Sequence, residues 1–168
     1  MAIMLFRRSK MEVNEEELNL FAGDKDNYYL KKWKNMEESG EIIDWNWGAF
    51  FFLTIWMGYR KMYLYAAVLI GLLVYIDVVL IASLHPLTQL GVDIFIGILL
   101  GIFGNRLYYK HSKKKISVIK SDQPDPEIQK IEIAKAGGTS WIGVGLVLMG
   151  TYFAVRLLYY FLNEGAKL

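Results

Sequence analysis

The sequence contains no cysteine, and it has no Lys or Arg at all between Leu64 and Gly104. The missing cysteine excludes disulfides, thiolate metal sites and cysteine nucleophiles. Within the stretch that lacks cations, the only charged side chains are Asp77 and Asp93. A soluble helical bundle of this length would need charged faces throughout. The middle of the chain is therefore predicted to lie in a membrane.

Signatures of catalysis and of nucleic-acid binding are also missing. The net charge is only +2, and the basic residues form no DNA- or RNA-binding pattern. No H-E-x-x-H, G-x-S-x-G, Walker loop or Gly-rich dinucleotide fingerprint occurs. His85 and His111 fall on opposite sides of the membrane in the topology derived below, so they cannot share a metal. We therefore predict a protein that is not an enzyme and has no metal site, no cofactor and no nucleic-acid partner.

Long apolar runs are present. Leu64–Leu84 is 21 residues long, which corresponds to about 31 Å of helix, roughly one hydrocarbon core. Leu87–Phe103 supplies a second run after a very short turn around His85–Gln89. Trp141–Leu162 is a third, interrupted by Arg156. These runs predict an all-α integral membrane protein with about three transmembrane helices.

The polar ends of the chain contain helix signals. Asn14 precedes three glutamates, which predicts a capped helix that ends near Gly23. A second helix is expected from about Asp24–Asn27 to Glu38, ending at Gly40, with one apolar stripe. That stripe either packs on the protein or lies on the membrane surface. In the connector, D-P-E at 125–127 predicts another helix start. The expected packing residues of this third helix are Ile128, Ile131 and Ile133.

The distribution of Lys and Arg predicts the orientation. Residues 1–46 contain seven and residues 105–139 contain eight, whereas the turn at 85–89 has none. Both basic segments are then cytoplasmic and the turn is external, which requires an even number of crossings between them. The aromatic stretch Trp47–Tyr59 has 13 residues, about 20 Å of helix and too short to span. We therefore predict that it is an interfacial or shallow re-entrant helix, and that the C-terminus is external.

Five segments follow from these patterns: a cytoplasmic amphipathic helical segment (1–46), an interfacial or re-entrant aromatic helix (47–63), a transmembrane hairpin (64–104), a basic cytoplasmic connector with a short helix (105–139), and a third transmembrane helix (140–163). Aromatic and basic side chains around the second segment suit the headgroup level of a membrane. They are Trp45, Trp47, Trp56, Tyr59, Arg60, Lys61 and Tyr63.

Four motifs carry a resemblance to a known family: F-A-G-D-K-D-N-Y-Y-L-K-K-W at 21–33, W-N-W-G-A-F-F-F at 45–52, W-M-G-Y-R-K-M-Y at 56–63 and G-N-R-L-Y-Y-K-H at 104–111. Together they resemble a bacterial domain-of-unknown-function family of small integral membrane proteins. The third apolar run lies outside these motifs. The resemblance implies a location in the inner membrane of a bacterium. It implies no particular activity.

Three charged residues are predicted within the membrane, where charges are costly and are usually paired or functional. In the expected topology Asp77 lies about 20 Å and Arg156 about 22 Å from the cytoplasmic face, and Asp93 lies about 9 Å from the outer face. All three converge on one layer, so Arg156 is predicted to pair with one or both aspartates. The alternative is that Arg156 extends toward the headgroups and each aspartate is protonated or bonded locally.

Glycines and lysines suggest two further roles. Gly97, Gly101 and Gly104 form a small-residue face suited to close helix packing. Its expected partners are the glycines of the third run, and packing within the chain is favoured over homodimerisation. The lysine run Lys113, Lys114 and Lys115 most simply fixes the topology, and anionic lipid headgroups are a second possible use.

Two classes of function agree with this sequence. The first is a non-catalytic membrane protein that acts through protein or lipid contacts, as an accessory or regulatory subunit. Its expected partners are the bilayer and either another membrane protein or further copies of itself. The second is a small oligomeric transporter or channel that uses Asp77, Asp93 and Arg156. The first is favoured, because three helices enclose little volume and the three charges can neutralise one another.

Overall fold

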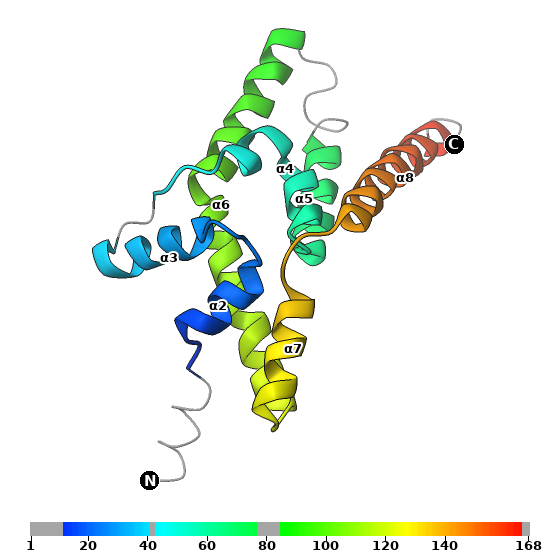
Figure 1. Ribbon diagram of the computed structural model, residues 1–168. Helices are drawn as coiled ribbons and strands as arrows, with labels where there is room; N and C mark the ends of the chain where they lie inside the picture. The colour runs from blue at the N-terminus through cyan, green and yellow to red at the C-terminus, as the bar shows by residue number, and fades with distance from the viewer. Residues whose placement is uncertain (1–11, 41–42, 77–84, 166–168) are drawn as a thin grey trace, which may run out of the picture. The chain divides into compact units, whose positions relative to one another are not determined.

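A computed structural model describes residues 12–40, 43–76 and 85–165. Within these ranges the chain is all-helical and has no strand, as predicted. The helices are α2 (Glu15–Ala22), α3 (Tyr28–Ser39), α4 (Trp47–Tyr59), α5 (Tyr63–Tyr75), α6 (Pro86–Asp122), α7 (Pro126–Ala136) and α8 (Trp141–Gly165) (Figure 1).

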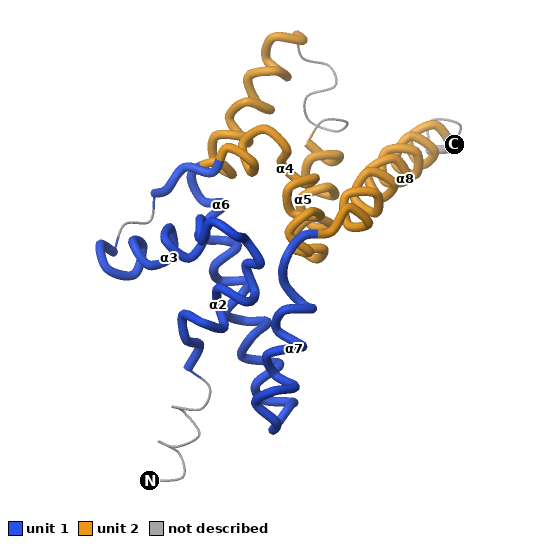
Figure 2. Tube along the Cα trace, in the orientation of Figure 1, with its two compact units in different colours: residues 1–46, 102–139 blue, residues 47–101, 140–168 orange. Residues whose placement is uncertain are grey.

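The helices belong to two compact units (Figure 2). Unit 1 comprises residues 1–46 and 102–139, and unit 2 comprises residues 47–101 and 140–168. The division separates two kinds of sequence. Unit 1 holds most of the charged residues, and unit 2 holds most of the apolar runs. Helix α6 contributes residues to both units.

The short helices of unit 1 begin and end where the sequence predicts. The Asn14 side chain accepts a hydrogen bond from the Glu17 backbone N–H, and the Glu17 carboxylate accepts one from the Asn14 N–H, each at 2.9 Å. This reciprocal pair satisfies two amide groups that the first turn of a helix leaves without partners. Helix α2 then ends at Gly23 and α3 at Gly40, both with positive φ. A left-handed terminal residue costs glycine little.

The second half of α6 corrects the prediction of a connector that begins at residue 105. The helix continues without interruption to Asp122. No glycine or proline occurs between residues 105 and 122 to end it. The buried residues of this half recur at helical spacing, so they lie on one face of α6, toward the rest of unit 1. They are Asn105, Tyr108, His111, Ser112 and Ile116.

Helix α7 begins as predicted and packs differently from the prediction. Asp125 accepts hydrogen bonds from the backbone N–H groups of Glu127 and Ile128, and Pro126 occupies the first turn. Ile133 is fully buried, but Ile128 and Ile131 are 42% and 67% exposed. The prediction for these two residues was wrong, because the short α7 buries only a narrow face. Beyond the helix, the Gly138 N–H donates to the Phe21 carbonyl at 2.7 Å.

In unit 2 the aromatic stretch is interrupted where its Arg-Lys pair occurs. Helix α4 ends at Tyr59 and α5 begins at Tyr63. Between them Lys61 adopts a positive φ of 57°, and Met62 is fully buried beneath the turn. The aromatic stretch is thus separate from α5, and it is itself kinked at Leu53, whose φ is 44°. Residues 77–84 of the predicted first span lie outside the described residues, as does Asp77.

Helix α8 approaches the end of α4 at two glycines. A Cβ atom added to Gly58 would lie 2.7 Å from the Gly143 carbonyl oxygen, and one added to Gly143 would overlap the Gly58 oxygen. The Ser140 N–H also donates to the Tyr59 carbonyl at 2.8 Å. Small residues let helix backbones come this close. The partner of Gly143 is therefore Gly58 on α4, whereas the glycine face of α6 was expected.

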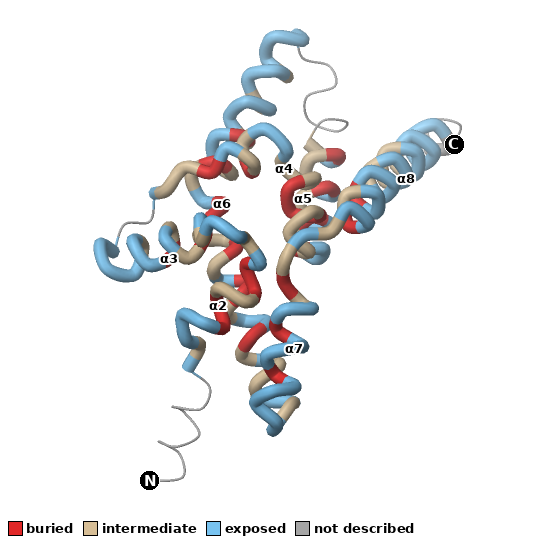
Figure 3. Tube along the Cα trace, in the orientation of Figure 1, coloured by how far each residue is buried: buried red, intermediate tan, exposed pale blue. Residues whose placement is uncertain are grey.

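The two longest apolar helices of unit 2 leave most of their surface uncovered. By length and composition, the α6 segment and residues 141–163 of α8 could each cross a membrane. Their most apolar stretches are only 17% and 11% buried (Figure 3). Helices α4 and α5, as described, are too short to qualify. By this criterion the described residues contain two helices that could cross a membrane, whereas three were predicted.

The close glycine contact gives a test of the α4–α8 packing. Gly143→Ala places a methyl group against backbone atoms of α4, which cannot move aside as a flexible side chain can. We expect it to destabilise the protein by about 1–3 kcal/mol. The measurement is unfolding in detergent by titration with sodium dodecyl sulfate. Gly150→Ala is the control, because its added methyl group meets open space, and it should leave stability nearly unchanged. Equal effects of the two changes would contradict the contact.

Candidate functional site

The sequence motifs at 21–33 and 104–111 meet in the aromatic core of unit 1. Tyr108 on α6 is fully buried, and its ring centroid lies 6.1 Å from Phe21, 4.9 Å from Tyr29 and 5.3 Å from Trp33. These tilted and edge-to-face arrangements are the favoured geometries for aromatic pairs. The stripe predicted on the second helix therefore packs against the protein's own α6.

Next to this core lies a fully buried amide, Asn105. Its side-chain oxygen accepts a hydrogen bond from the Asn46 amide at 2.7 Å, and its nitrogen donates to the Asp44 carboxylate at 3.1 Å. Its backbone oxygen accepts from the Trp33 indole N–H at 3.2 Å. Buried polar groups are costly unless they are bonded. Asn105 therefore joins α6, α3 and the segment before α4 in one network.

Charged residues extend the network toward the surface. The Asp44 carboxylate also forms an ion pair with Lys32, and this hydrogen bond raises the pKa of the lysine. At the other end of α6, Lys120 pairs with Glu17 at 2.8 Å, with both side chains largely buried. In these two pairs each charge is matched by an opposite one, as desolvated ions require.

His111 lies on the same helix and is only 7% exposed. Burial, together with the positive charges of Lys115 and Lys114, lowers the pKa of its imidazole to about 4. The ring packs edge-on against Phe21 at 6.0 Å. At neutral pH, His111 is therefore an uncharged member of the core.

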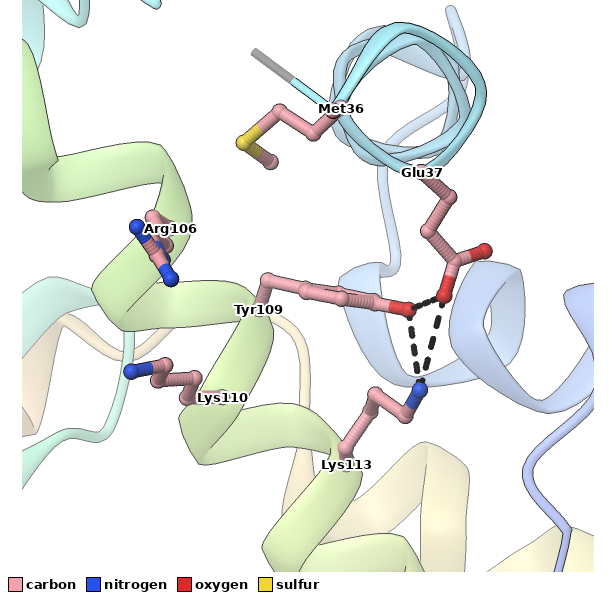
Figure 4. A pocket seen from close by; sticks show the side chains of 7 residues that line it. Met36, Glu37, Arg106, Tyr109, Lys110 and Lys113 are labelled. Carbon is pink, nitrogen blue, oxygen red and sulfur yellow. Dashed lines mark hydrogen bonds and ion pairs between the residues drawn. The ribbon is translucent and has the colours of Figure 1, made fainter. Parts of the chain in front are cut away.

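A pocket of about 390 Å³ opens beside this core, between α3 and α6 of unit 1 (Figure 4). Basic side chains dominate its wall. The lining residues are Met36, Glu37, Gly40, Arg106, Tyr109, Lys110 and Lys113. Arg106 and Lys110 are one helical turn apart on α6, so their side chains are neighbours. This pocket is the candidate functional site.

One acidic residue balances part of the positive charge. The Glu37 carboxylate accepts a hydrogen bond from the Tyr109 hydroxyl and lies 3.4 Å from the Lys113 amine. Lys113 also donates to the Tyr109 hydroxyl at 3.1 Å. In Figure 4 this triangle lies on one side of α6, and Arg106 and Lys110 extend from the other. Within the described part of the chain, neither of these two cations forms an ion pair.

The predicted intramembrane charge cluster is only partly described. Asp77 lies outside the described residues. Asp93 and Arg156 are exposed on α6 and α8, and among the residues described neither forms an ion pair. The pairing of Arg156 with an aspartate therefore stays a prediction.

The aromatic and basic motif is divided between surface and core. Trp47 and Tyr63 are 62% and 44% exposed, whereas Trp56 is buried within unit 2. Tyr59 stacks edge-on against Trp141, with ring centroids 5.3 Å apart, and Arg60 lies over the Tyr59 ring at 5.8 Å. Trp45, Tyr59, Arg60 and Lys61 are half-buried. Part of the motif thus packs against the protein's own helices.

The structure also shows the surroundings of the predicted glycine face and of the lysine run. Gly97, Gly101 and Gly104 are all buried. A Cβ atom added to Gly97 would lie 3.2 Å from the Phe50 carbonyl oxygen, so the contact made here is with α4. Of the lysine run, Lys113 lines the pocket, whereas Lys114 and Lys115 are exposed on α6.

Sequence reasoning missed three residues of this region: Asn105, Arg106 and Lys110. The four-residue spacing of Arg106 and Lys110 was visible, but it places two cations on one face only if residues 105–122 are helical. The role of Asn105 depends on partners that are about 60 positions away along the chain. No local pattern indicates such partners.

The amide network predicts a large effect of a small change. Asn105→Ala removes the buried hydrogen bonds that its side chain forms with the Asn46 amide and the Asp44 carboxylate, and should destabilise unit 1 by about 2–4 kcal/mol. Hydrogen exchange of the α3 and α6 amides measures this opening free energy. The same change at the exposed Asn35 of α3 is the control and should cost less than about 0.5 kcal/mol. Equal protection in both variants would refute the role of Asn105.

The lowered pKa of His111 predicts a pH dependence of stability. The unfolded chain binds the His111 proton near the usual pKa of 6.5, and the folded chain only near pH 4. Its contribution is therefore fully present above pH 6.5 and is lost as the pH falls toward 4. Thermal unfolding in detergent across this range should show the decline. His111→Gln should flatten it, and His85→Gln, at an exposed site, should retain it. A slope unchanged in His111→Gln would contradict this account.

Comparison with known proteins gives a family. A family model described as "Protein of unknown function (DUF2628)" matches residues 11–114, which is more than half of the chain. No curated protein and no solved structure matches the chain. The match includes the aromatic core, Asn105 and the pocket, and it excludes α7 and α8. The resemblance to a domain-of-unknown-function family is thereby confirmed, and its bacterial and membrane character stays a prediction. The chain belongs to the DUF2628 family.

Proposed function

We propose that this protein is a multi-pass protein of a bacterial cytoplasmic membrane that acts without catalysis, through protein or lipid contacts, as an accessory or regulatory subunit. In this proposal unit 2 is the membrane-embedded part. Unit 1, with its folded core and basic pocket, is the cytoplasmic part that makes regulatory contacts.

The observation that supports the membrane location is the exposure of apolar helix surface. The apolar segments of α6 and α8 bury 17% and 11% of their residues. An apolar core helix of a soluble protein would be mostly covered, because exposed apolar area is unfavourable in water. Aromatic and aliphatic side chains cover the length of α8, including Tyr152, Phe153, Leu157 and Tyr160, all at least half exposed. A hydrocarbon environment accounts for such a surface.

The orientation is supported by the charges. The seven and eight Lys or Arg residues in the two parts of unit 1 favour the cytoplasmic side for both.

The residues of the candidate site support a role in binding contacts more than a role in catalysis. Its lining residues are three cations, Tyr109, the paired Glu37, Met36 and Gly40. The Tyr109 hydroxyl and the Glu37 carboxylate are bonded to each other and to Lys113.

Because the chain lacks cysteine, single cysteines can report its topology. Lys34→Cys and Lys114→Cys lie on exposed positions of unit 1, and Thr88→Cys lies in the turn region. We expect a membrane-impermeant maleimide to label Thr88→Cys in intact cells. The two unit 1 variants should react only after the cells are broken. The protein should also stay in the membrane fraction after a carbonate wash.

Two outcomes would contradict this proposal. Labelling of Lys114→Cys in intact cells would overturn the orientation, and release by carbonate would overturn the membrane location. The accessory role is tested by purification in mild detergent. Stoichiometric co-purification with a distinct membrane protein supports it. A symmetric oligomer of this chain alone that carries ions into liposomes would instead establish the transporter alternative.

A further inference from the structure

The pocket between α3 and α6 holds positive charge that its own residues leave unbalanced. Three of its lining residues are cationic and one is acidic. Glu37 is already engaged by Tyr109 and Lys113. Arg106 and Lys110 form no ion pair within the described part of the chain. Adjacent cations in a concave site raise the local concentration of anions.

We propose that this pocket binds a phosphate-bearing anion through Arg106 and Lys110. A guanidinium presents a planar set of donors that matches phosphate oxygens, and a lysine amine adds a compact charge. The two side chains are one helical turn apart, so both can reach a single phosphate group. The volume of about 390 Å³ falls within the range of small-ligand sites.

The position of the two cations along α6 favours a lipid headgroup as the source of the phosphate. Arg106 lies two residues beyond the end of the apolar run at Gly104. If that run spans the bilayer, residues at its cytoplasmic end lie at the depth of the lipid phosphates. The lipid source therefore rests on the proposed function, whereas the pocket's preference for phosphate does not. A soluble phosphate presents the same group, so the experiment must separate the two.

The pocket also distinguishes among the basic residues of α6. Lys114 and Lys115 are exposed and do not line it. Lys113 lines it but is held by Glu37 and Tyr109. If binding were a matter of charge alone, Lys114 and Lys115 would serve as well as Arg106 and Lys110. If the pocket provides the site, only the second pair matters.

The test uses the full chain, purified in an uncharged maltoside detergent. Calorimetric titrations with dihexanoyl phosphatidylglycerol, which is water-soluble, and with inorganic phosphate give the two dissociation constants. The pocket variant is Arg106→Gln with Lys110→Gln. The control, Lys114→Gln with Lys115→Gln, removes the same charge from the same helix. We expect saturable binding that weakens about tenfold or more in the pocket variant, and changes less than twofold in the control.

The two probes identify the source. Tighter binding of the phosphatidylglycerol indicates a lipid headgroup, and equal or tighter binding of inorganic phosphate indicates a soluble ligand. Equal weakening in both variants, or no saturable binding of either probe, overturns the proposal. If carbonate releases the protein from the membrane but phosphate binding is intact, the proposed membrane location is wrong and the proposed binding site is supported. If the protein stays in the membrane fraction but binds neither probe, the membrane location is supported and the proposed binding site is wrong.

A third variant guards against loss of binding through misfolding. Glu37→Gln removes the acid that holds Lys113, so the pocket gains a free cation. We expect about two- to fivefold tighter binding of the same probes. Since damage to the fold cannot strengthen a specific site, tighter binding supports the proposal. Unchanged or weaker binding in a variant with normal thermal stability contradicts it.

Discussion

Unit 1 depends on the hydrogen bonds of one buried amide. Asn105 has no access to solvent, and its partners come from residues 44–46 and from Trp33. Hydrogen bonds are directional, so they fix the rotation of α6 about its axis in a way that apolar contacts alone would not. With that rotation set, Tyr108 faces the aromatic core, and Arg106 and Tyr109 face the pocket. The pocket's geometry is therefore a consequence of the amide network.

Unit 2 is assembled by a different principle. Glycines provide two of its close helix contacts, Gly58 with Gly143 and Gly97 with the backbone of Phe50. In lipid, burying apolar area gives little advantage, so close backbone approach and dispersion contacts become the main source of helix association. This agrees with helices that leave large apolar side chains on their outer surfaces. The two units thus differ in sequence and also in the type of contact that stabilises them.

Sequence patterns predicted local features well and long-range ones poorly. The N-cap at Asn14, the ends at Gly23 and Gly40, the start at Asp125 and the break near Arg60 each depend on a few adjacent residues. The continuation of α6 was missed because polar composition was taken as a sign of a connector, although no helix breaker was present. The partner of Gly143 and the pocket require knowledge of which helices pack together. Spacing within one helix cannot provide it.

The basic residues of unit 1 have two proposed roles, membrane orientation and anion recognition, and these roles depend on different properties. Membrane orientation depends on how many cations lie on one side, whatever their partners. Recognition depends on cations that remain uncompensated within a concave surface. Lys120 and Lys113 are paired with Glu17 and Glu37, and Lys130 with Glu16, so these serve only the first role. Arg106 and Lys110 serve both. A count of charges therefore leads only to the proposed topology, whereas the contacts indicate where an anion would bind.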